Sequence, residues 1–121
     1  MKNKKQILII DDDNSTRLLL QYLLAEKYSV IGKTNGLEGM LWLNAGNIPD
    51  VILLDINMPH LNGKDFLKQI RFSGFFSEIP VLILSSESHL QEIKSFISPN
   101  DILGKPFIPE ILFSKLEKIN M

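Results

Sequence analysis

The chain alternates short apolar runs with longer amphipathic segments, and this alternation constrains its fold more than any other feature. Residues 7–10 and 81–84 are continuous apolar runs, the pattern of strands covered on both faces. Strands are expected at 7–10, 30–34, 51–55, 81–84 and 102–104, and helices at 17–27, 37–44, 64–72, 90–97 and 109–119. Strands that alternate with helices predict an α/β fold, in which a parallel sheet carries helices on both faces.

The bulk composition excludes several classes of protein. At 121 residues the chain fits one domain, and we expect a single domain over 1–121 with no output domain after Met121. A net charge of −1 argues against electrostatic binding to nucleic acid or membranes. The absence of cysteine excludes disulfides and thiolate metal sites. No apolar run is long enough for a signal peptide or a membrane span, so the expected location is the cytoplasm.

Polar residues follow the expected strands where each strand ends. They are Asp11, Asp12, Asp55, Ser85 and Lys105. Each has an ordinary explanation, because acids often cap helices, serines often begin turns and lysines are usually solvated. In a parallel sheet, however, all carboxyl ends lie at one edge, where open α/β sheets hold their sites. The residues can therefore converge on one pocket.

The chemistry of that pocket follows from its residue types. Three close carboxylates repel one another unless a cation lies among them. Their hard oxygens suit Mg²⁺, with Mn²⁺ as an alternative, and no cysteine or suitably spaced histidine pair competes. Lys105 and Ser85 would bind an anion beside Asp55. A carboxylate placed between Mg²⁺ and a lysine can attack a phosphoryl group.

Four motifs in register give the chain a specific resemblance. They are residues 7–13 (ILIIDDD), 55–59 (DINMP) with Gly63, 80–86 (PVLILSS) and 105–107 (KPF). In these motifs the chain resembles the receiver domain of two-component response regulators, including chemotaxis regulators, over nearly its whole length. The resemblance implies a flavodoxin-like three-layer (βα)5 sandwich, with a five-stranded parallel sheet of order 2-1-3-4-5.

The resemblance also assigns a role to each site residue. It implies a signalling switch rather than an enzyme, in which Asp55 accepts a phosphoryl group from a sensor histidine kinase or a histidine phosphotransfer protein. Asp12 would bind Mg²⁺ directly and Asp11 through water, and the backbone carbonyl of Asn57 would complete the protein ligands. Ser85 and Lys105 would bind the phosphoryl group, and the peptide bond before Pro106 would be cis. The side chains of Asn57 and Glu87 would tune dephosphorylation.

The sequence departs from the family pattern in its expected switching region. Ile102 stands where relatives usually carry a tyrosine or phenylalanine, and the interval from Ser85 to Lys105 is shorter than usual, so the fourth helix should be short or displaced. The expected output is binding of an unidentified downstream protein through the fourth helix, fifth strand and fifth helix. We expect a monomer or a weak phosphorylation-dependent dimer.

Two other classes of protein compete with this interpretation. A receiver-like module could bind partners without phosphorylation, although such modules commonly lose a pocket acid or the lysine and this chain keeps both. A phosphatase of the haloacid-dehalogenase type could use the segment from Asp11 to Ser15, but the chain lacks the later acidic pair and the cap domain of those enzymes. Phosphorylation by acetyl phosphate separates the first class from the leading interpretation.

Overall fold

The strands and helices alternate along the chain as the sequence predicts. The computed structural model describes residues 4–56, 63–86 and 101–119. The described elements, in chain order, are β1 (Gln6–Ile10), α1 (Asn14–Leu24), β2 (Ser29–Lys33), α2 (Gly36–Asn44), β3 (Val51–Asp55), α3 (Gly63–Phe72), β4 (Val81–Ser86), β5 (Ile102–Lys105) and α5 (Pro109–Lys118). The helix predicted at 90–97 lies outside the described residues.

The five strands form one parallel sheet, in the order β2-β1-β3-β4-β5. This order confirms the expected flavodoxin-like topology, in which each crossover connection carries the chain back to start the next parallel strand. The register places Asp55 beside Leu84 on β4, and Ser85 beside Gly104 on β5. The carboxyl ends of β1, β3, β4 and β5 therefore lie at one edge of the sheet.

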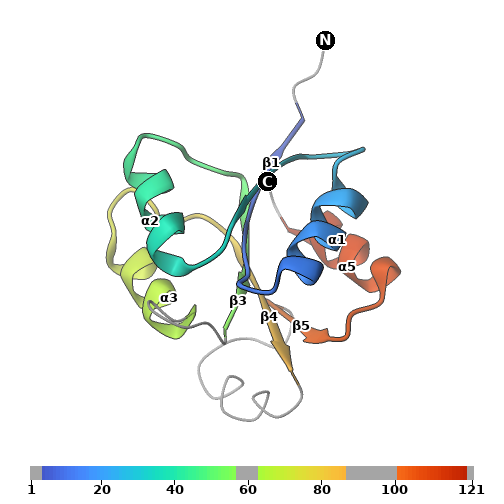
Figure 1. Cartoon of the computed structure of the whole chain (residues 1–121). Helices are drawn as coiled ribbons and strands as arrows, with labels where there is room; N and C mark the ends of the chain where they lie inside the picture. The colour runs from blue at the N-terminus through green and yellow to red at the C-terminus, as the bar shows by residue number, and fades with distance from the viewer. Residues whose placement is uncertain (1–3, 57–62, 87–100, 120–121) are drawn as a thin grey trace.

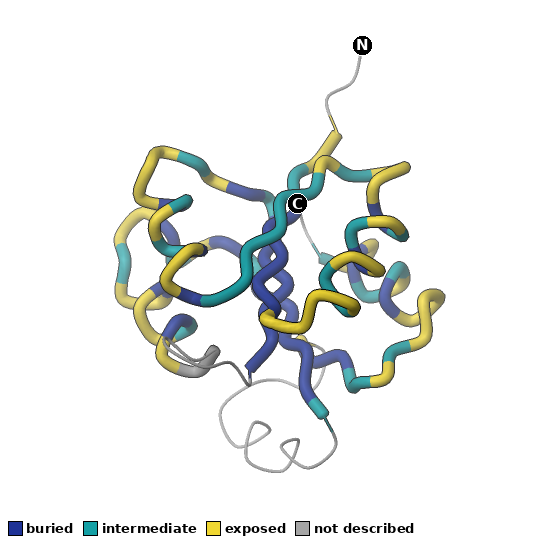
Figure 2. The backbone as a smooth tube through the Cα atoms, in the orientation of Figure 1, coloured by how far each residue is buried: buried dark blue, intermediate teal, exposed yellow. Residues whose placement is uncertain are grey.

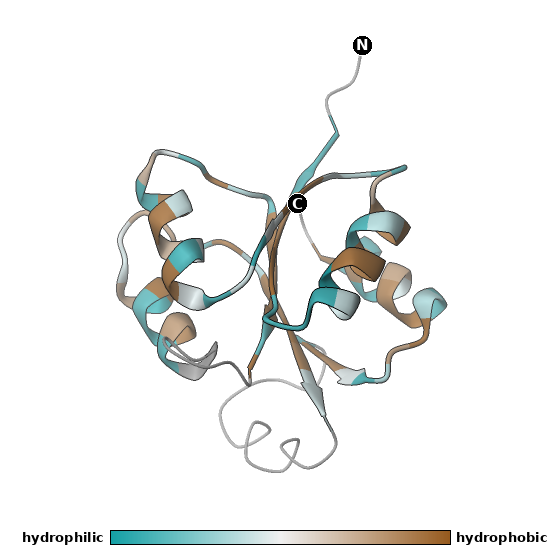
Figure 3. Cartoon of the chain, viewed as in Figure 1, coloured by the Kyte–Doolittle hydropathy of each residue, from teal (hydrophilic) through white to brown (hydrophobic). Residues whose placement is uncertain are grey.

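Helices cover the sheet on both faces, so the strands are buried between two apolar layers. Figure 1 shows α2 and α3 on one face and α1 and α5 on the other. The centre of the sheet is buried and apolar while the outer helix surfaces are exposed (Figures 2 and 3). One core cluster joins the sheet to Leu43, Phe66 and Ile70 of α2 and α3. The other joins it to Leu20 and Leu112 of α1 and α5.

Alternate residues of each strand face these two layers. On β3, Val51 and Leu53 pack towards α1 and α5, whereas Ile52 and Leu54 pack towards α2 and α3. This period of two is a property of every β-strand. A residue at the end of a strand is therefore expected to face the same layer as the residue two places before it.

Helix α2 packs closely against the sheet because of a single glycine. A Cβ atom built at Gly39 would lie 2.5 Å from Cδ1 of Ile10 on β1 and 3.3 Å from the ring of Phe66 on α3. On the same helix Trp42 is partly buried and packs against the core, whereas Leu41 is exposed.

The first helix differs from its predicted range. It begins at Asn14 rather than Arg17, because the side chain of Asp13 accepts a hydrogen bond from the backbone N–H of Thr16 at 3.0 Å. Asn14, Ser15 and Thr16 are therefore helical, and Asp13 is the cap. The helix ends at Leu24, three residues before the predicted Lys27.

Candidate phosphoacceptor site

Strand phase places three charged residues in the layer of α1 and α5. Asp11 follows Ile9 by two residues, Asp55 follows Leu53, and Lys105 follows Leu103. All three preceding residues belong to the core cluster on the α1 and α5 side. The backbone N–H of Asp11 donates to the carbonyl of Lys33 at 3.1 Å, so strand pairing extends through this position. Parallel pairing and side-chain alternation together bring these groups to one edge on one face.

The three predicted acids form a tight cluster at this edge. One carboxylate oxygen from each of Asp11, Asp12 and Asp55 lies within 4.8 Å of the other two. Asp11 and Asp55 are buried, whereas Asp12 is exposed. The cluster is therefore accessible to solvent on the side of Asp12, so an ion could enter it from that side.

Lys105 supplies the positive charge that the cluster needs. Its Nζ lies 3.1 Å from Oδ2 of Asp11 and 3.4 Å from Oδ2 of Asp55. Two strand spacings, about 10 Å, separate β5 from β3, so a long side chain is required to make this contact. Burial by itself lowers the pKa of the Lys105 ammonium, but the carboxylates of Asp11 and Asp55 outweigh burial and raise the pKa above its usual value.

The carboxylate of Asp11 is engaged on both oxygens. Oδ1 accepts a hydrogen bond from the backbone N–H of Asp13 at 2.9 Å, and Oδ2 pairs with Lys105. The backbone carbonyl of Asp11 accepts a hydrogen bond from Nη1 of Arg17 at 2.9 Å. Arg17 was not among the residues selected from the sequence, because a polar residue on an amphipathic helix gives no signal that it bonds a strand end.

Asp13 belongs to the helix rather than to the acid cluster. Hydrogen bonds from the Thr16 hydroxyl and backbone N–H are the main causes that lower the pKa of Asp13, and Lys105 adds a smaller attraction. Its role in the loop is to start α1, which fixes where the chain turns after Asp12.

Ile102 lies in the opposite layer, and Ser85 lies near the carboxyl end of β4. Ser85 follows Ile83, a member of the core cluster on the α2 and α3 side, and Ile102 belongs to that cluster itself. Both residues are buried, and the Ser85 hydroxyl donates to the carbonyl of Ser86 at 3.1 Å. Of the two predicted switch residues, Ile102 therefore packs in the layer of α2 and α3, while Ser85 directly follows Leu84, the register partner of Asp55.

The remaining predicted residues have two different outcomes. The peptide bond between Lys105 and Pro106 is cis, which confirms that prediction. Asn57 and Glu87 lie outside the described residues, so their predicted roles stay predictions.

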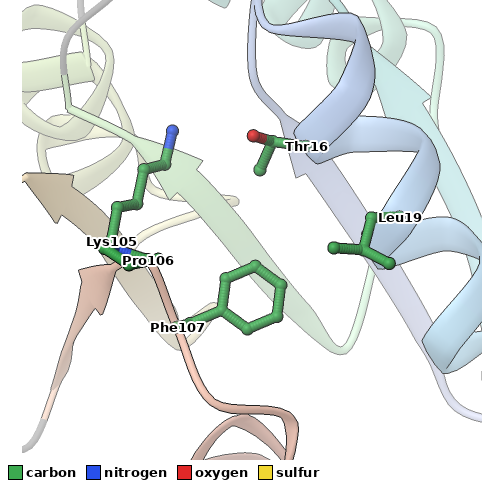
Figure 4. A pocket seen from close by; sticks show the side chains of 5 residues that line it. All are labelled: Thr16, Leu19, Lys105, Pro106 and Phe107. Atoms are coloured by element: carbon green, nitrogen blue, oxygen red, sulfur yellow. The ribbon is translucent and has the colours of Figure 1, made fainter.

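A pocket of about 380 Å³ adjoins the cluster, between α1 and the loop after β5. Thr16, Leu19, Lys105, Pro106 and Phe107 line it. Figure 4 shows Lys105, Pro106 and Phe107 on one side of the pocket and Thr16 and Leu19 of α1 on the other. The pocket gives an approach to Lys105 from the α1 side.

The donor set of the cluster fits a hard divalent cation. Mg²⁺ binds oxygen at about 2.1 Å, so two of its direct ligands lie at most about 4.2 Å apart. A set of oxygens within 4.8 Å can therefore share one ion when one of them acts through water. Three carboxylates and one lysine leave a net negative charge, which a divalent cation neutralises.

Fold and site together define a flavodoxin-like domain with an acidic pocket at the carboxyl edge of its sheet. A family model described as "Response regulator receiver domain" matches residues 7–117. The chain belongs to this family of response regulator receiver domains of two-component systems, which are signalling modules rather than enzymes.

Individual relatives agree with this assignment. The chemotaxis protein CheY1 of Helicobacter pylori is 30% identical over 118 residues, a match that covers 94% of this chain and 95% of CheY1. The response regulator MprA of Mycobacterium sp. is 33% identical, and the match covers 94% of this chain but 50% of MprA. The chemotaxis response regulator CheY4 of Vibrio cholerae has a solved structure that superimposes with a TM-score of 0.85 at 28% identity, covering 98% of this chain and 100% of CheY4.

None of the described helices is both long enough and apolar enough to cross a bilayer.

Proposed function

We propose that Asp55 accepts a phosphoryl group from a sensor histidine kinase or a histidine phosphotransfer protein, in a reaction that requires Mg²⁺. The observation that carries this proposal is the position of Lys105, whose Nζ contacts Asp55 and Asp11 at the edge where three carboxylates meet. A nucleophilic carboxylate needs neighbouring positive charge, because the incoming phosphoryl group is itself an anion. Lys105 places a fixed positive charge beside Asp55, and the acid cluster offers a binding site for a second cation next to the same carboxylate.

The transfer is a displacement at phosphorus. An oxygen of Asp55 forms a bond to phosphorus, the bond from phosphorus to the donor histidine nitrogen breaks, and the electron pair stays on the imidazole. The product is an aspartyl phosphate, and Lys105 remains within reach of the phosphoryl oxygens. A divalent cation held by the acid cluster would supply further positive charge for the transferring group.

Asp12 and Asp55 would hold the ion directly. Asp11 would act through water, since both of its oxygens are already engaged by Asp13 and Lys105. The backbone carbonyl of Asn57 would be the further protein ligand. Mn²⁺ is a hard octahedral ion of the same class and would replace Mg²⁺.

The apolar surface of α1 supports a protein as the phosphate donor. Leu18, Leu19 and Tyr22 are exposed on this helix, and Leu19 also lines the pocket that ends at Lys105. A protein that buries these side chains would place a phosphorylated residue over the pocket, and exposed apolar groups of this kind mark protein contacts. Kinases draw their phosphate from ATP, and we propose the cytoplasm as the compartment where both meet.

The phosphorylated state would be transmitted through Ser85 and Ile102. We propose that the Ser85 hydroxyl leaves the Ser86 carbonyl to donate to the phosphoryl group, and that Ile102 repacks in response. The surface formed by the fourth helix, β5 and α5 would then bind a downstream protein. Asn57 and Glu87 would orient the water that attacks phosphorus and returns Asp55 to its carboxylate.

Acetyl phosphate tests the proposal without a cognate kinase. Incubation with acetyl phosphate and Mg²⁺ should add the mass of one phosphoryl group, and the gain should be absent from Asp55→Asn and from samples with excess chelator. Asp50→Asn is the matched control, because Asp50 is an acid at the opposite edge of the sheet whose carboxylate accepts from the N–H of Gln6 at 2.7 Å. This variant should gain the mass. A wild-type protein that gains no mass would instead be a receiver-like module that works without phosphorylation.

A further inference from the structure

Arg17 bridges the two ends of the loop that carries Asp12. Its Nη1 donates to the backbone carbonyl of Asp11 at 2.9 Å, and its Nη2 donates to the side chain of Asn14. Asp11 is the residue at the end of β1, and Asn14 is the first residue of α1. One guanidinium therefore fixes the separation between the strand end and the helix start, with Asp12 between them.

The path of Arg17 depends on a glycine in the neighbouring strand. A Cβ atom built at Gly32 on β2 would lie 3.1 Å from Cδ of Arg17 and 3.0 Å from Nε2 of Gln21. At these distances the side chains of Arg17 and Gln21 would have to shift by a few tenths of an ångström. The bare backbone of Gly32 thus leaves the space through which the Arg17 stem returns towards β1.

The charge of Arg17 acts on the β2 side of the loop. The pKa of Glu38 is lowered mainly by hydrogen bonds from Thr34, with smaller attractions from Lys33 and Arg17. Arg17 contacts the loop through the backbone carbonyl of Asp11, whereas Lys105 contacts the carboxylates of Asp11 and Asp55 themselves.

We propose that Arg17 is a positioning residue for the divalent cation: it sets the place of Asp12 by holding the Asp11 carbonyl and the Asn14 side chain together. This inference rests on the proposed Mg²⁺ site. Asp12 is the exposed member of the cluster, on the loop that Arg17 closes. Losing the bridge frees the loop, and a carboxylate that must be ordered on binding gives weaker affinity than one already in place.

Calorimetric titration with Mg²⁺, in the absence of any phosphate donor, measures the effect directly. Arg17→Gln should weaken Mg²⁺ binding about tenfold, the lower end of the range for residues that orient metal ligands. Arg17→Lys keeps the charge and can replace one of the two hydrogen bonds, so its affinity should lie between those of Arg17→Gln and the wild type. Calorimetry is combined with the melting temperature measured without Mg²⁺.

Arg71 is the matched control for a purely structural arginine. Its Nη1 also donates to backbone carbonyls, those of Ser77 at 3.2 Å and Ile79 at 3.1 Å, near the end of α3. Arg71→Gln should lower the melting temperature about as much as Arg17→Gln but leave Mg²⁺ affinity unchanged. An equal loss of affinity in the two variants would overturn the inference, because it would mean that lost stability alone weakens binding.

A double-mutant cycle with Gly32→Ala tests the mechanism. Gly32→Ala alone should weaken Mg²⁺ binding in the same direction, because the added methyl group displaces Arg17. In an Arg17→Gln background the same substitution should have little further effect on affinity, since coupled residues are not additive. Full additivity would overturn the proposed path.

The outcomes separate this inference from the proposed function. If the wild type binds Mg²⁺ and Arg17→Gln binds it equally well or more tightly, the positioning role is wrong and the phosphoacceptor site stands. If the wild type does not bind Mg²⁺, the cation site itself is wrong and the positioning role falls with it.

Discussion

Replacing Lys105 by Met removes the charge that faces two buried carboxylates and keeps a side chain of similar length. The Nζ distances of 3.1 and 3.4 Å correspond to about 5 kcal/mol of attraction each at an effective dielectric constant of about 20, before the cost of desolvation. Removing one partner of a buried ion pair leaves the others uncompensated. We therefore expect Lys105→Met to lose about 3 kcal/mol of unfolding free energy near pH 7 without divalent cations.

The effect of the substitution has a defined pH dependence. The pKa of Lys105 is raised in the folded protein, because Asp11 and Asp55 outweigh burial. Its contribution is therefore fully present below the pKa of an unfolded lysine, about 10.4, and is lost as the pH rises through the higher folded value. The difference between wild type and variant should be constant from about pH 7 to about pH 9 and shrink above about pH 10.5.

Urea denaturation followed by far-ultraviolet circular dichroism measures this difference at each pH. Lys68→Met is the control, because Lys68 is exposed on α3, and its stability should stay within about 0.5 kcal/mol of the wild type. The reasoning is refuted if Lys105→Met is as stable as the wild type near pH 7. It is equally refuted if the difference grows above about pH 10.5, since that is the wrong sign for a raised pKa.

Three further predictions concern packing, capping and docking. Replacing a helical glycine by alanine usually stabilises a protein. Gly39→Ala should nevertheless lower the unfolding free energy, measured by urea denaturation, by about 1–3 kcal/mol, because its Cβ would overlap the side chain of Ile10 on β1. Gly74→Ala, where the added Cβ meets open space, should not lower the unfolding free energy. Asp13→Ala should lower the melting temperature, because it removes the cap of α1. The hydrogen bonds from Thr16 lower the pKa of Asp13 in the folded protein. The difference in melting temperature between wild type and variant should therefore vanish as the pH falls below about 3.9 and through the folded pKa of Asp13. Leu18→Arg should slow phosphotransfer from a kinase about tenfold and leave acetyl phosphate labelling unchanged; equal slowing by both donors would contradict docking on α1.

The sequence predicts the fold well because its strands are buried on both faces. Such strands must be continuous apolar runs, and runs of this kind at residues 7–10, 51–54 and 81–84 are visible without any structure. The strand order comes from family resemblance, since periodicity does not record which strands are neighbours. The start of α1 was predicted three residues late, because Asp13 could be assigned to the acid cluster or to the helix and only the contact with Thr16 decides.

The acid cluster and Lys105 were predictable because they are strand-end residues, and parallel strands end together. Arg17 was not predictable, because its partner is a backbone carbonyl and every residue has one. The packing around Gly32 was not predictable either, because the close contact at this glycine comes from the Arg17 and Gln21 side chains and not from its own backbone conformation.

The alternation of strand residues has a consequence for how such a protein diversifies. Leu53 and Leu103, two places before Asp55 and Lys105, pack in the layer of α1 and α5, while Ile102 packs in the layer of α2 and α3. Substitutions on the outer side of α1 can therefore accumulate without disturbing the packing of Ile102.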